Sequence, residues 1–513
     1  MSDHRHLFKS AGTVSIFTLG SRILGFIRDV VIAKAFGTGL AAQAFVVAFR
    51  VPNMLRDLVG EGATNAAVIP VLSECLARKD MREFWRLSAI LLTWIVLILS
   101  ALCAAGMLGA PLFVRLIAAG FVAEPEKFAL TVSLTRILFP FIFLVGLSAF
   151  AMGVLNSLKQ FALPAAGPCI LNATMIVFGL WICPYFSEPV AGLAVAVLIG
   201  GALQVVVQFQ AMYRQGFRVQ IRGSLRHPAI RSIGKLMMPR IIGSSIYQLN
   251  VLLDTMFASF GSIVGEGAVA ALYFANRLIQ FPSALFGTAL ATASLPVLSR
   301  MAIADDMPRL KETLSLSLRS LIISLLPAAA GLFILARPIV EVLFEHGEFN
   351  TYSTRMTTIA LQFYCLGMYA YSAARVVTSC FYALKDTLTP LKITFFCLML
   401  NVAINLLLMR VLKVGAMALA TSASSTVNFA LLLFLLRRKI GPLGLRSLRR
   451  PLVRTLWVSA AMGGVCAQTH AACLAQGVRP PLSLTAAMGA GALCLALLGW
   501  AAGLFRGLRR HIL

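Results

Sequence analysis

Four arginines lie deep inside apolar segments of the sequence, where a charged side chain needs a partner or a function. They are Arg22, Arg28, Arg56 and Arg277. Arg22 and Arg28 lie roughly 14 Å and 22 Å into the first segment if it is helical, too deep for the side chains to reach the membrane surface easily. Guanidinium groups stay charged in a low dielectric and bind phosphate through paired hydrogen bonds. A cavity lined by these residues is therefore expected to bind an anion, and a diphosphate suits it.

Acidic residues inside the apolar segments are few: Asp29, Asp57, Glu61 and Asp254. Asp29 follows Arg22 by seven residues, so both lie on one helix face, and Asp29 could neutralise Arg22. Glu61 is a second candidate partner. A structural alternative stays open, in which these charges form ion pairs that only hold the protein together.

A second polar group combines Asp254 with Asn401, Asn405 and Thr421. Asn401 and Asn405 are four residues apart, which places them on one helix face. One carboxylate with several neutral oxygens could hold Na⁺ or H⁺, and interhelical hydrogen bonding is the equally weighted alternative. The ten cysteines are scattered singly, so no other metal site is indicated.

The composition describes the elements that must position these groups. Of the 513 residues, 59% are hydrophobic and 12% charged, and the mean hydropathy is +0.87, which excludes a large water-soluble enzyme. A window of about 19 residues predicts an all-α polytopic membrane protein with about fourteen transmembrane helices. The predicted spans are 13–36, 42–64, 87–111, 132–156, 163–183, 190–212, 236–260, 268–297, 314–336, 356–381, 390–410, 414–436, 452–473 and 483–505.

Basic residues are unevenly divided between the two sets of connecting loops. One set, with both termini, carries 27 of the 45 Lys and Arg residues, and the other carries about seven. The positive-inside rule therefore predicts that the N- and C-termini are cytoplasmic. The net charge of +26 is then explained by topology and by contact with anionic membrane lipids, and nucleic acid is not an expected partner.

An internal repeat is visible in the sequence. Residues 69–73 (IPVLS) recur as residues 295–299 (LPVLS), and Leu158-Lys159 recurs as Leu384-Lys385, both 226 residues later. The repeat predicts two parallel six-helix lobes with two appended helices, an arrangement typical of alternating-access transporters. The expected domains are an N-lobe over 1–212, a basic linker over 213–235, a C-lobe over 236–436, and the last two spans with a basic tail over 437–513.

Proline and glycine interrupt the spans that carry the deep arginines. Pro52, Gly60 and Gly62 lie in the second span, and Pro282 and Gly287 in the eighth. These helices are expected to be kinked or locally unwound, which opens room for a substrate.

Several of these segments together resemble the MviN/MurJ lipid II flippase family of the multidrug/oligosaccharidyl-lipid/polysaccharide exporter superfamily. They are residues 21–29 (SRILGFIRD), 50–56 (RVPNMLR), 61–63 (EGA) and 273–278 (YFANRL). The resemblance implies a flippase that moves undecaprenyl-diphosphate-linked peptidoglycan precursor from the cytoplasmic to the outer leaflet of the bacterial inner membrane. It also implies that the four arginines are cavity residues, and that Asp254, Asn401, Asn405 and Thr421 match a proposed sodium site.

Three positions depart from the pattern of that family. Gln43 and Asn276 stand where the family often has an acid, and Asp57 stands where it often has a second arginine. Gating or proton transfer through carboxylates at the first two positions is therefore not expected here. Asp57 lies beside Arg56 and could form a replacement ion pair.

Two other functions remain open from the sequence. The chain could export another polyprenyl-diphosphate-linked glycan, or it could be a non-transporting scaffold for cell-wall synthesis proteins. An enzyme is not expected, because the sequence has no nucleophile constellation, phosphate-binding loop or metal cluster. No cofactor is expected beyond a coupling Na⁺ or H⁺ and the membrane potential.

Overall fold

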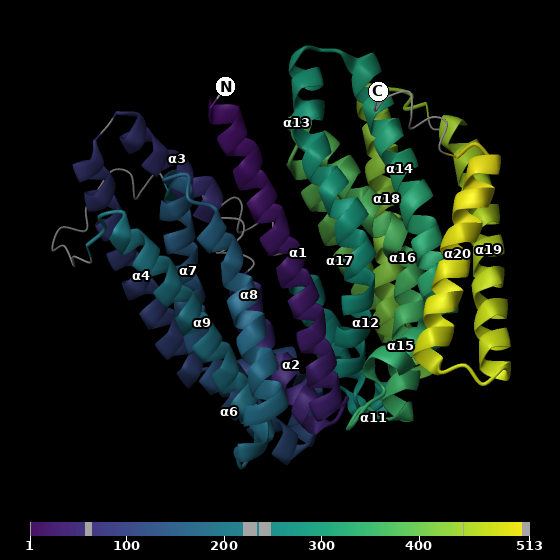
Figure 1. The fold of residues 1–513 in the computed structure, drawn as a ribbon, viewed down its shortest axis with the longest axis horizontal. Helices are drawn as coiled ribbons and strands as arrows, with labels where there is room; N and C mark the ends of the chain where they lie inside the picture. The colour runs from purple at the N-terminus through teal and green to yellow at the C-terminus, as the bar shows by residue number, and fades with distance from the viewer. Residues whose placement is uncertain are drawn as a thin grey trace. The chain divides into compact units, whose positions relative to one another are not determined.

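A computed structural model describes residues 2–56, 64–78, 80–218, 233–234, 248–444 and 446–504 of the chain. Within these ranges every regular element is a helix and no strand is found. The chain divides into two compact units, Met1–Phe260 and Gly261–Leu513. The first is coloured purple to blue in Figure 1 and the second green to yellow. The predicted all-α fold class is confirmed.

The first unit begins with the helix that carries Arg22 and Arg28. Its elements are α1 (Ser2–Phe36), α2 (Leu40–Arg56), α3 (Thr64–Ala77), α4 (Met81–Leu108), α5 (Ala110–Ile117), η2 (Ala119–Ala123), α6 (Pro125–Leu138), α7 (Pro140–Ser157), α8 (Ala162–Val177), η3 (Phe178–Ile182), η4 (Cys183–Tyr185) and α9 (Pro189–Arg214). Residues 248–258 add a further helical stretch.

The second unit carries Arg277 and the two asparagines of the candidate cation site. Its elements are α11 (Gly261–Val264), α12 (Ala268–Pro282), η5 (Ser283–Thr288), α13 (Ala289–Ile303), α14 (Met307–Ile334), α15 (Ala336–Phe344), α16 (Thr351–Ala383), α17 (Leu388–Leu412), α18 (Val414–Ile440), α19 (Arg446–Ala475) and α20 (Pro480–Ala501).

The helices coincide with the predicted membrane spans. Within the described ranges, nine helices are long and apolar enough to cross a membrane. The other five predicted spans fall on α1, on α2, on residues 248–258, on α16 and on α19, which carry more polar residues or are only partly described. The chain is a multi-pass membrane protein.

The internal repeat extends to details of the backbone. Asp80 caps α4 by accepting a hydrogen bond from the Glu83 N–H at 2.9 Å, and Asp306, 226 residues later, caps α14 in the same way. Lys159 and Lys385 both adopt a left-handed backbone, with φ of 61° and 60°. Non-glycine residues rarely adopt this conformation, so its recurrence at the same offset is further evidence for the internal repeat.

The compact units divide later in the chain than the predicted lobes. The helical stretch that ends near residue 258 belongs to the first unit, where the Gly120 N–H donates a hydrogen bond to Ser259 Oγ at 2.9 Å. A Cβ on Gly120 would lie 2.3 Å from the Ser259 carbonyl oxygen, so only glycine permits this approach. The domain boundaries predicted from the sequence stay predictions, and most of the linker over 213–235 lies outside the described residues.

The eighth span is irregular at the proline that the sequence indicates. Directly after Pro282, α12 passes into the π-helix η5 and then into α13. Gly287 lies in this π-helix, and a Cβ there would come within 2.6 Å of the Ser372 side chain on α16. The expected local unwinding therefore takes the form of a π-helical turn packed closely against α16, and such turns are frequent at functional sites.

Asp386 joins the turn before α17 to the end of α18. Its carboxylate forms an ion pair with Lys439 Nζ at 2.5 Å and accepts hydrogen bonds from the backbone and hydroxyl of Thr389. The hydrogen bond from Lys439 is the main cause that lowers the pKa of Asp386 to about 2. A depressed carboxylate pKa stabilises the fold above the unfolded value near 3.9, and this stability is lost as the pH falls toward 2.

We therefore expect Asp386→Asn to lower the thermal unfolding midpoint of the detergent-solubilised protein at pH 7. The difference from wild type should shrink as the pH falls from about 5 toward 2, because the wild-type carboxylate then becomes protonated. A difference that is constant over this range would show that the ion pair does not stabilise the fold.

Candidate substrate-binding site

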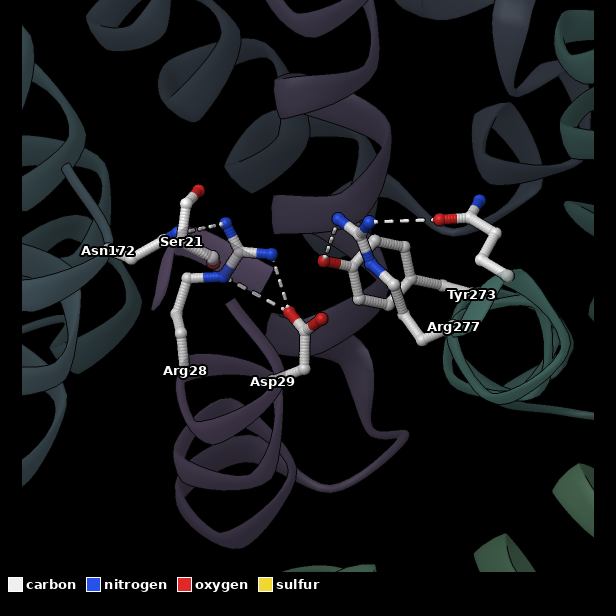
Figure 2. Close-up of polar contacts among 7 residues, drawn as sticks. Ser21, Arg28, Asp29, Asn172, Tyr273 and Arg277 are labelled. Carbon is white, nitrogen blue, oxygen red and sulfur yellow. Dashed lines mark hydrogen bonds and ion pairs between the residues drawn. The ribbon is translucent and has the colours of Figure 1, made fainter. Parts of the chain in front are cut away.

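The first group of predicted site residues is organised around Arg28 on α1. Arg28 Nε and Nη2 donate to Asp29 Oδ1 at 3.1 and 2.7 Å, and Arg28 Nη1 donates to Asn172 Oδ1 at 2.9 Å (Figure 2). Asn172 lies on α8, and its Nδ2 donates to the Ser21 carbonyl oxygen at 3.1 Å. Arg28 and Asp29 are 5% and 1% exposed, so this ion pair is buried between α1 and α8.

Asn172 lies where the two helices approach closely. A Cβ on Gly25 would be 3.4 Å from Asn172 Nδ2, which is tight but ordinary packing. Because Asn172 satisfies both Arg28 and a backbone carbonyl of α1, it fixes α8 against the helix that carries the arginines. Sequence reasoning did not select Asn172, although an asparagine in an apolar span is a detectable signal.

Arg22 differs from Arg28 in its surroundings. It lies six residues earlier on α1, about 9 Å along the axis, and its side chain is exposed. It has no hydrogen bond or ion pair to other described residues. The pairing of Asp29 with Arg22 that helix spacing allows is not found in the structure, where Asp29 forms an ion pair with the neighbouring Arg28. The long, flexible side chain of Arg28 reaches the carboxylate of the next residue, although adjacent residues lie on different faces of a helix.

Arg56 is the last residue of α2 and is half-buried. The predicted partners Glu61 and Asp57 both lie outside the described residues, and so do Gly60 and Gly62. Gln43, the first departure from the family pattern, is buried within α2 at 2% exposure. The roles assigned to Arg56 and Glu61 stay predictions.

In the second unit, Arg277 is held by residues of its own helix. Its Nη2 donates to Tyr273 Oη and its Nη1 donates to Gln280 Oε1, both at 3.2 Å, and its guanidinium lies 5.0 Å from the centre of the Tyr273 ring (Figure 2). Gln280 Nε2 donates in turn to Asn276 Oδ1 at 3.4 Å. The neutral Asn276 thus takes part in orienting Arg277 through Gln280.

Arg375 on α16 repeats this arrangement of an arginine with a tyrosine four residues earlier. Its guanidinium lies 4.3 Å from the centre of the Tyr371 ring, hydrogen bonds to the Tyr371 hydroxyl, and donates to Thr288 Oγ1 at 2.6 Å. Thr288 ends the π-helix η5. The sequence analysis did not select Arg375, and the Tyr-x-x-x-Arg spacing that it shares with Arg277 is the signal that was missed.

The four residues of the candidate cation site belong to different units, Asp254 to the first and the other three to the second. Asn405 Nδ2 donates to Asn401 Oδ1 at 2.9 Å and Asn401 Nδ2 donates to Thr421 Oγ1 at 3.3 Å, so α17 and α18 bring these three residues together. Both asparagines are fully buried. Asp254 is half-buried on the helical stretch of the first unit. The two asparagines and Thr421 supply neutral side-chain oxygens of the kind that hard cations bind. A cation-binding role for this group stays a prediction.

The internal repeat relates the two polar groups. Asp254 follows Arg28 by 226 residues, and Asn401 lies one helical turn beyond the position equivalent to Asn172. In both sequence repeats a charged residue on the first span is therefore followed by an asparagine at a nearly equivalent position on the fifth. Within the described ranges, no group of three or more histidine, cysteine, aspartate or glutamate residues could hold a metal ion.

Comparison with known proteins gives a consistent result. The sequence profile of the family described as lipid II flippase MurJ matches residues 32–484. The lipid II flippase MurJ of Burkholderia cenocepacia is 35% identical over 441 residues, which are 85% of this chain and 84% of that protein. The probable lipid II flippase MurJ of Vibrio cholerae is 33% identical over 435 residues, 83% of this chain and 82% of that protein.

Solved structures show the same relationship. A structure of lipid II flippase MurJ in an inward closed conformation has a TM-score of 0.79 and 25% identity, and the match covers 96% of this chain and 99% of that one. An inward-facing multidrug resistance MATE transporter of the MOP superfamily has a TM-score of 0.70 and 15% identity, and the match covers 82% of this chain and 95% of that one. This transporter therefore has the same fold. This chain belongs to the lipid II flippase MurJ family.

Proposed function

We propose that this chain is a flippase that moves lipid II, the undecaprenyl-diphosphate-linked peptidoglycan precursor, from the cytoplasmic to the outer leaflet of a bacterial inner membrane. The observation that carries the proposal is the contrast on α1 between exposed Arg22 and buried, ion-paired Arg28. A transporter of an anionic lipid needs a positively charged side chain that can bind the phosphate and release it again. Arg22 can do so, because its guanidinium forms no hydrogen bond or ion pair with other described residues.

Each of the four arginines has its own role in binding the diphosphate. Arg22 contacts the phosphate oxygens directly, and Arg28, which Asp29 and Asn172 hold in place on the same helix, is a second arginine that contacts the diphosphate. Arg277 presents a guanidinium oriented by Tyr273 and Gln280 from the other lobe. Arg56 and Glu61 complete the site. The prenyl tail stays in the lipid, and alternating access of the lobes carries the glycan headgroup across.

The membrane potential favours this direction of transport. With both termini cytoplasmic, an anionic headgroup moves outward at a gain of about 2.3 kcal/mol per charge per 100 mV. Basic residues on the cytoplasmic side contact anionic lipids, and cell-wall synthesis proteins are proposed partners that receive or supply the cargo.

The coupling ion is proposed to be Na⁺ or H⁺, held by Asp254 with the oxygens of Asn401, Asn405 and Thr421. The hydrogen-bonded chain through the last three residues and the equivalence of Asp254 with Arg28 support this grouping. A bound cation would neutralise the Asp254 carboxylate and thereby lower its desolvation cost inside the membrane.

For Na⁺, we expect the thermal unfolding midpoint of the purified protein to rise on replacing choline with Na⁺, and Asp254→Asn to remove this rise. Asp386→Asn also removes a carboxylate but lies outside the group, so it should keep the Na⁺-dependent shift. An Asp254→Asn protein with the full shift and full transport would contradict the cation site. A pH-dependent shift that Asp254→Asn removes and Asp386→Asn keeps, with no response to Na⁺, would assign the ion as H⁺.

Rescue of a bacterium depleted of its own lipid II flippase tests the proposed function. Lipid II in the outer leaflet is measured by cleavage with an externally added toxin that hydrolyses it. Rescue with restored cleavage is expected. A well-inserted wild-type chain that does not restore cleavage would indicate another polyprenyl-diphosphate glycan as cargo, or a scaffold without transport.

A further inference from the structure

A cavity at one end of the second unit lies apart from both polar groups described above. It has a volume of about 450 Å³ and lies between the first turns of α14 and the chain that enters α19. Helices α14 and α19 pack together, and the connection before α19 lies at the same end of the unit as the start of α14 (Figure 1). Cavities of roughly 300–1,000 Å³ are typical of small-molecule sites.

One wall of the cavity is a polar face of α14. Lys311, Ser315 and Arg319 follow one another at intervals of four residues and so line about 12 Å of one helix face. Arg319 is half-buried, and its Nε is fully buried without a hydrogen-bond partner among the described residues. A buried donor without an acceptor is costly, so this position favours a ligand that supplies acceptor oxygens.

The opposite wall is the start of α19. The Ser447 N–H and hydroxyl both donate to the Gly444 carbonyl oxygen, at 3.0 and 2.8 Å, and the Ser447 and Ser315 hydroxyls lie 3.4 Å apart. Gly444 has a φ of +64°, which a larger residue would adopt only with strain. The cavity thus ends at the positive end of a 30-residue helix dipole.

The charge of the cavity is positive. Lys311 and Arg319 contribute two cations, and Glu312, an exposed residue, is the carboxylate among the described lining residues. This balance, together with the helix end, selects an anion. Phosphate oxygens match the donors best, because a guanidinium and an ammonium group can both contact one phosphate.

The remaining walls distinguish a lipid from a soluble phosphate. Leu443 is 3% exposed and Leu316 is half-buried, so apolar side chains lie next to the basic ones. Exposed Arg449 and Arg450 on the first turns of α19 add positive charge nearby. Basic pockets between transmembrane helices are typical binding places for anionic headgroups. We propose that this cavity binds the phosphate of an anionic phospholipid through Lys311 and Arg319, and that the lipid joins α14 to α19.

Native mass spectrometry and lipid titration of the full-length purified protein test this proposal. The probes are phosphatidylglycerol, phosphatidylcholine and inorganic phosphate. Wild type should retain phosphatidylglycerol in preference to phosphatidylcholine. The double variant Lys311→Gln/Arg319→Gln should bind phosphatidylglycerol about 30-fold more weakly, because each basic residue contributes roughly a five- to sixfold preference.

The matched control is Arg300→Gln/Arg437→Gln, which removes the same charge from exposed positions at the ends of α13 and α18. It should bind phosphatidylglycerol within a factor of about two of wild type. Equal weakening in both double variants would overturn the site in favour of general surface charge. Competition by inorganic phosphate as effective as that by the lipid would overturn the lipid assignment. A thermal unfolding midpoint near that of wild type, measured without lipid, shows that the cavity variant is folded.

Discussion

Arg22→Ala is expected to abolish rescue of a flippase-depleted bacterium and to reduce lipid II cleavage from outside by about 100-fold or more. Arg22 is exposed on α1 and can offer two parallel N–H groups to a phosphate. Each hydrogen bond to a charged group contributes about 1.5–3 kcal/mol, so losing two costs at least 3 kcal/mol of substrate affinity. Arg22→Lys keeps the charge but not the paired geometry, so its defect should be intermediate.

The stability of the Arg22 variants separates binding from folding. Because Arg22 has no hydrogen bond or ion pair to other described residues, its removal should leave the thermal unfolding midpoint unchanged. Arg277→Ala should show the same loss of transport, whereas Arg300→Ala, at an exposed position in the last turn of α13, should transport normally. Normal rescue by Arg22→Ala and Arg277→Ala would remove both arginines from the substrate site.

Most of the fold could be predicted from the sequence because crossing a membrane imposes a length and an apolar composition on each helix. The 226-residue repeat was visible in short motifs such as residues 295–299, and the structure repeats caps and turns at the same offset. The amphipathic helices α5 and α15 were missed. They have eight and nine residues, too few to stand out in a window chosen for membrane spans.

The partners of the arginines could be predicted only in part. The helix-face rule paired Asp29 with Arg22, but side-chain length lets Arg28 reach the adjacent carboxylate. The second partner, Asn172, lies 144 residues away along the chain, so packing of α8 on α1 decides the contact. By contrast, the contacts of Arg277 with Tyr273 and Gln280 are four and three residues apart and could be read from helical spacing.

Asp29→Ala should destabilise the protein more than any other single change in the site. The Arg28–Asp29 pair is 5% and 1% exposed, and removal of the carboxylate takes away the countercharge that contacts this buried guanidinium at 2.7 Å. Breaking a buried pair in this way costs about 3–5 kcal/mol. Asn172→Ala removes one neutral acceptor of the same guanidinium and should cost less, about 1–3 kcal/mol. Thermal unfolding of the detergent-solubilised variants measures both.

The double variant Arg28→Met/Asp29→Leu shows whether the pair is only structural. Replacing both charges by apolar side chains of similar volume removes the desolvation cost, so the unfolding midpoint should return close to that of wild type. Transport should nevertheless be lost, because the Arg28 guanidinium that contacts the diphosphate is gone. A stable double variant that restores external lipid II cleavage would show that Arg28 and Asp29 serve the packing of α1 on α8 alone. Equal midpoints for wild type and Asp29→Ala would contradict the buried ion pair itself.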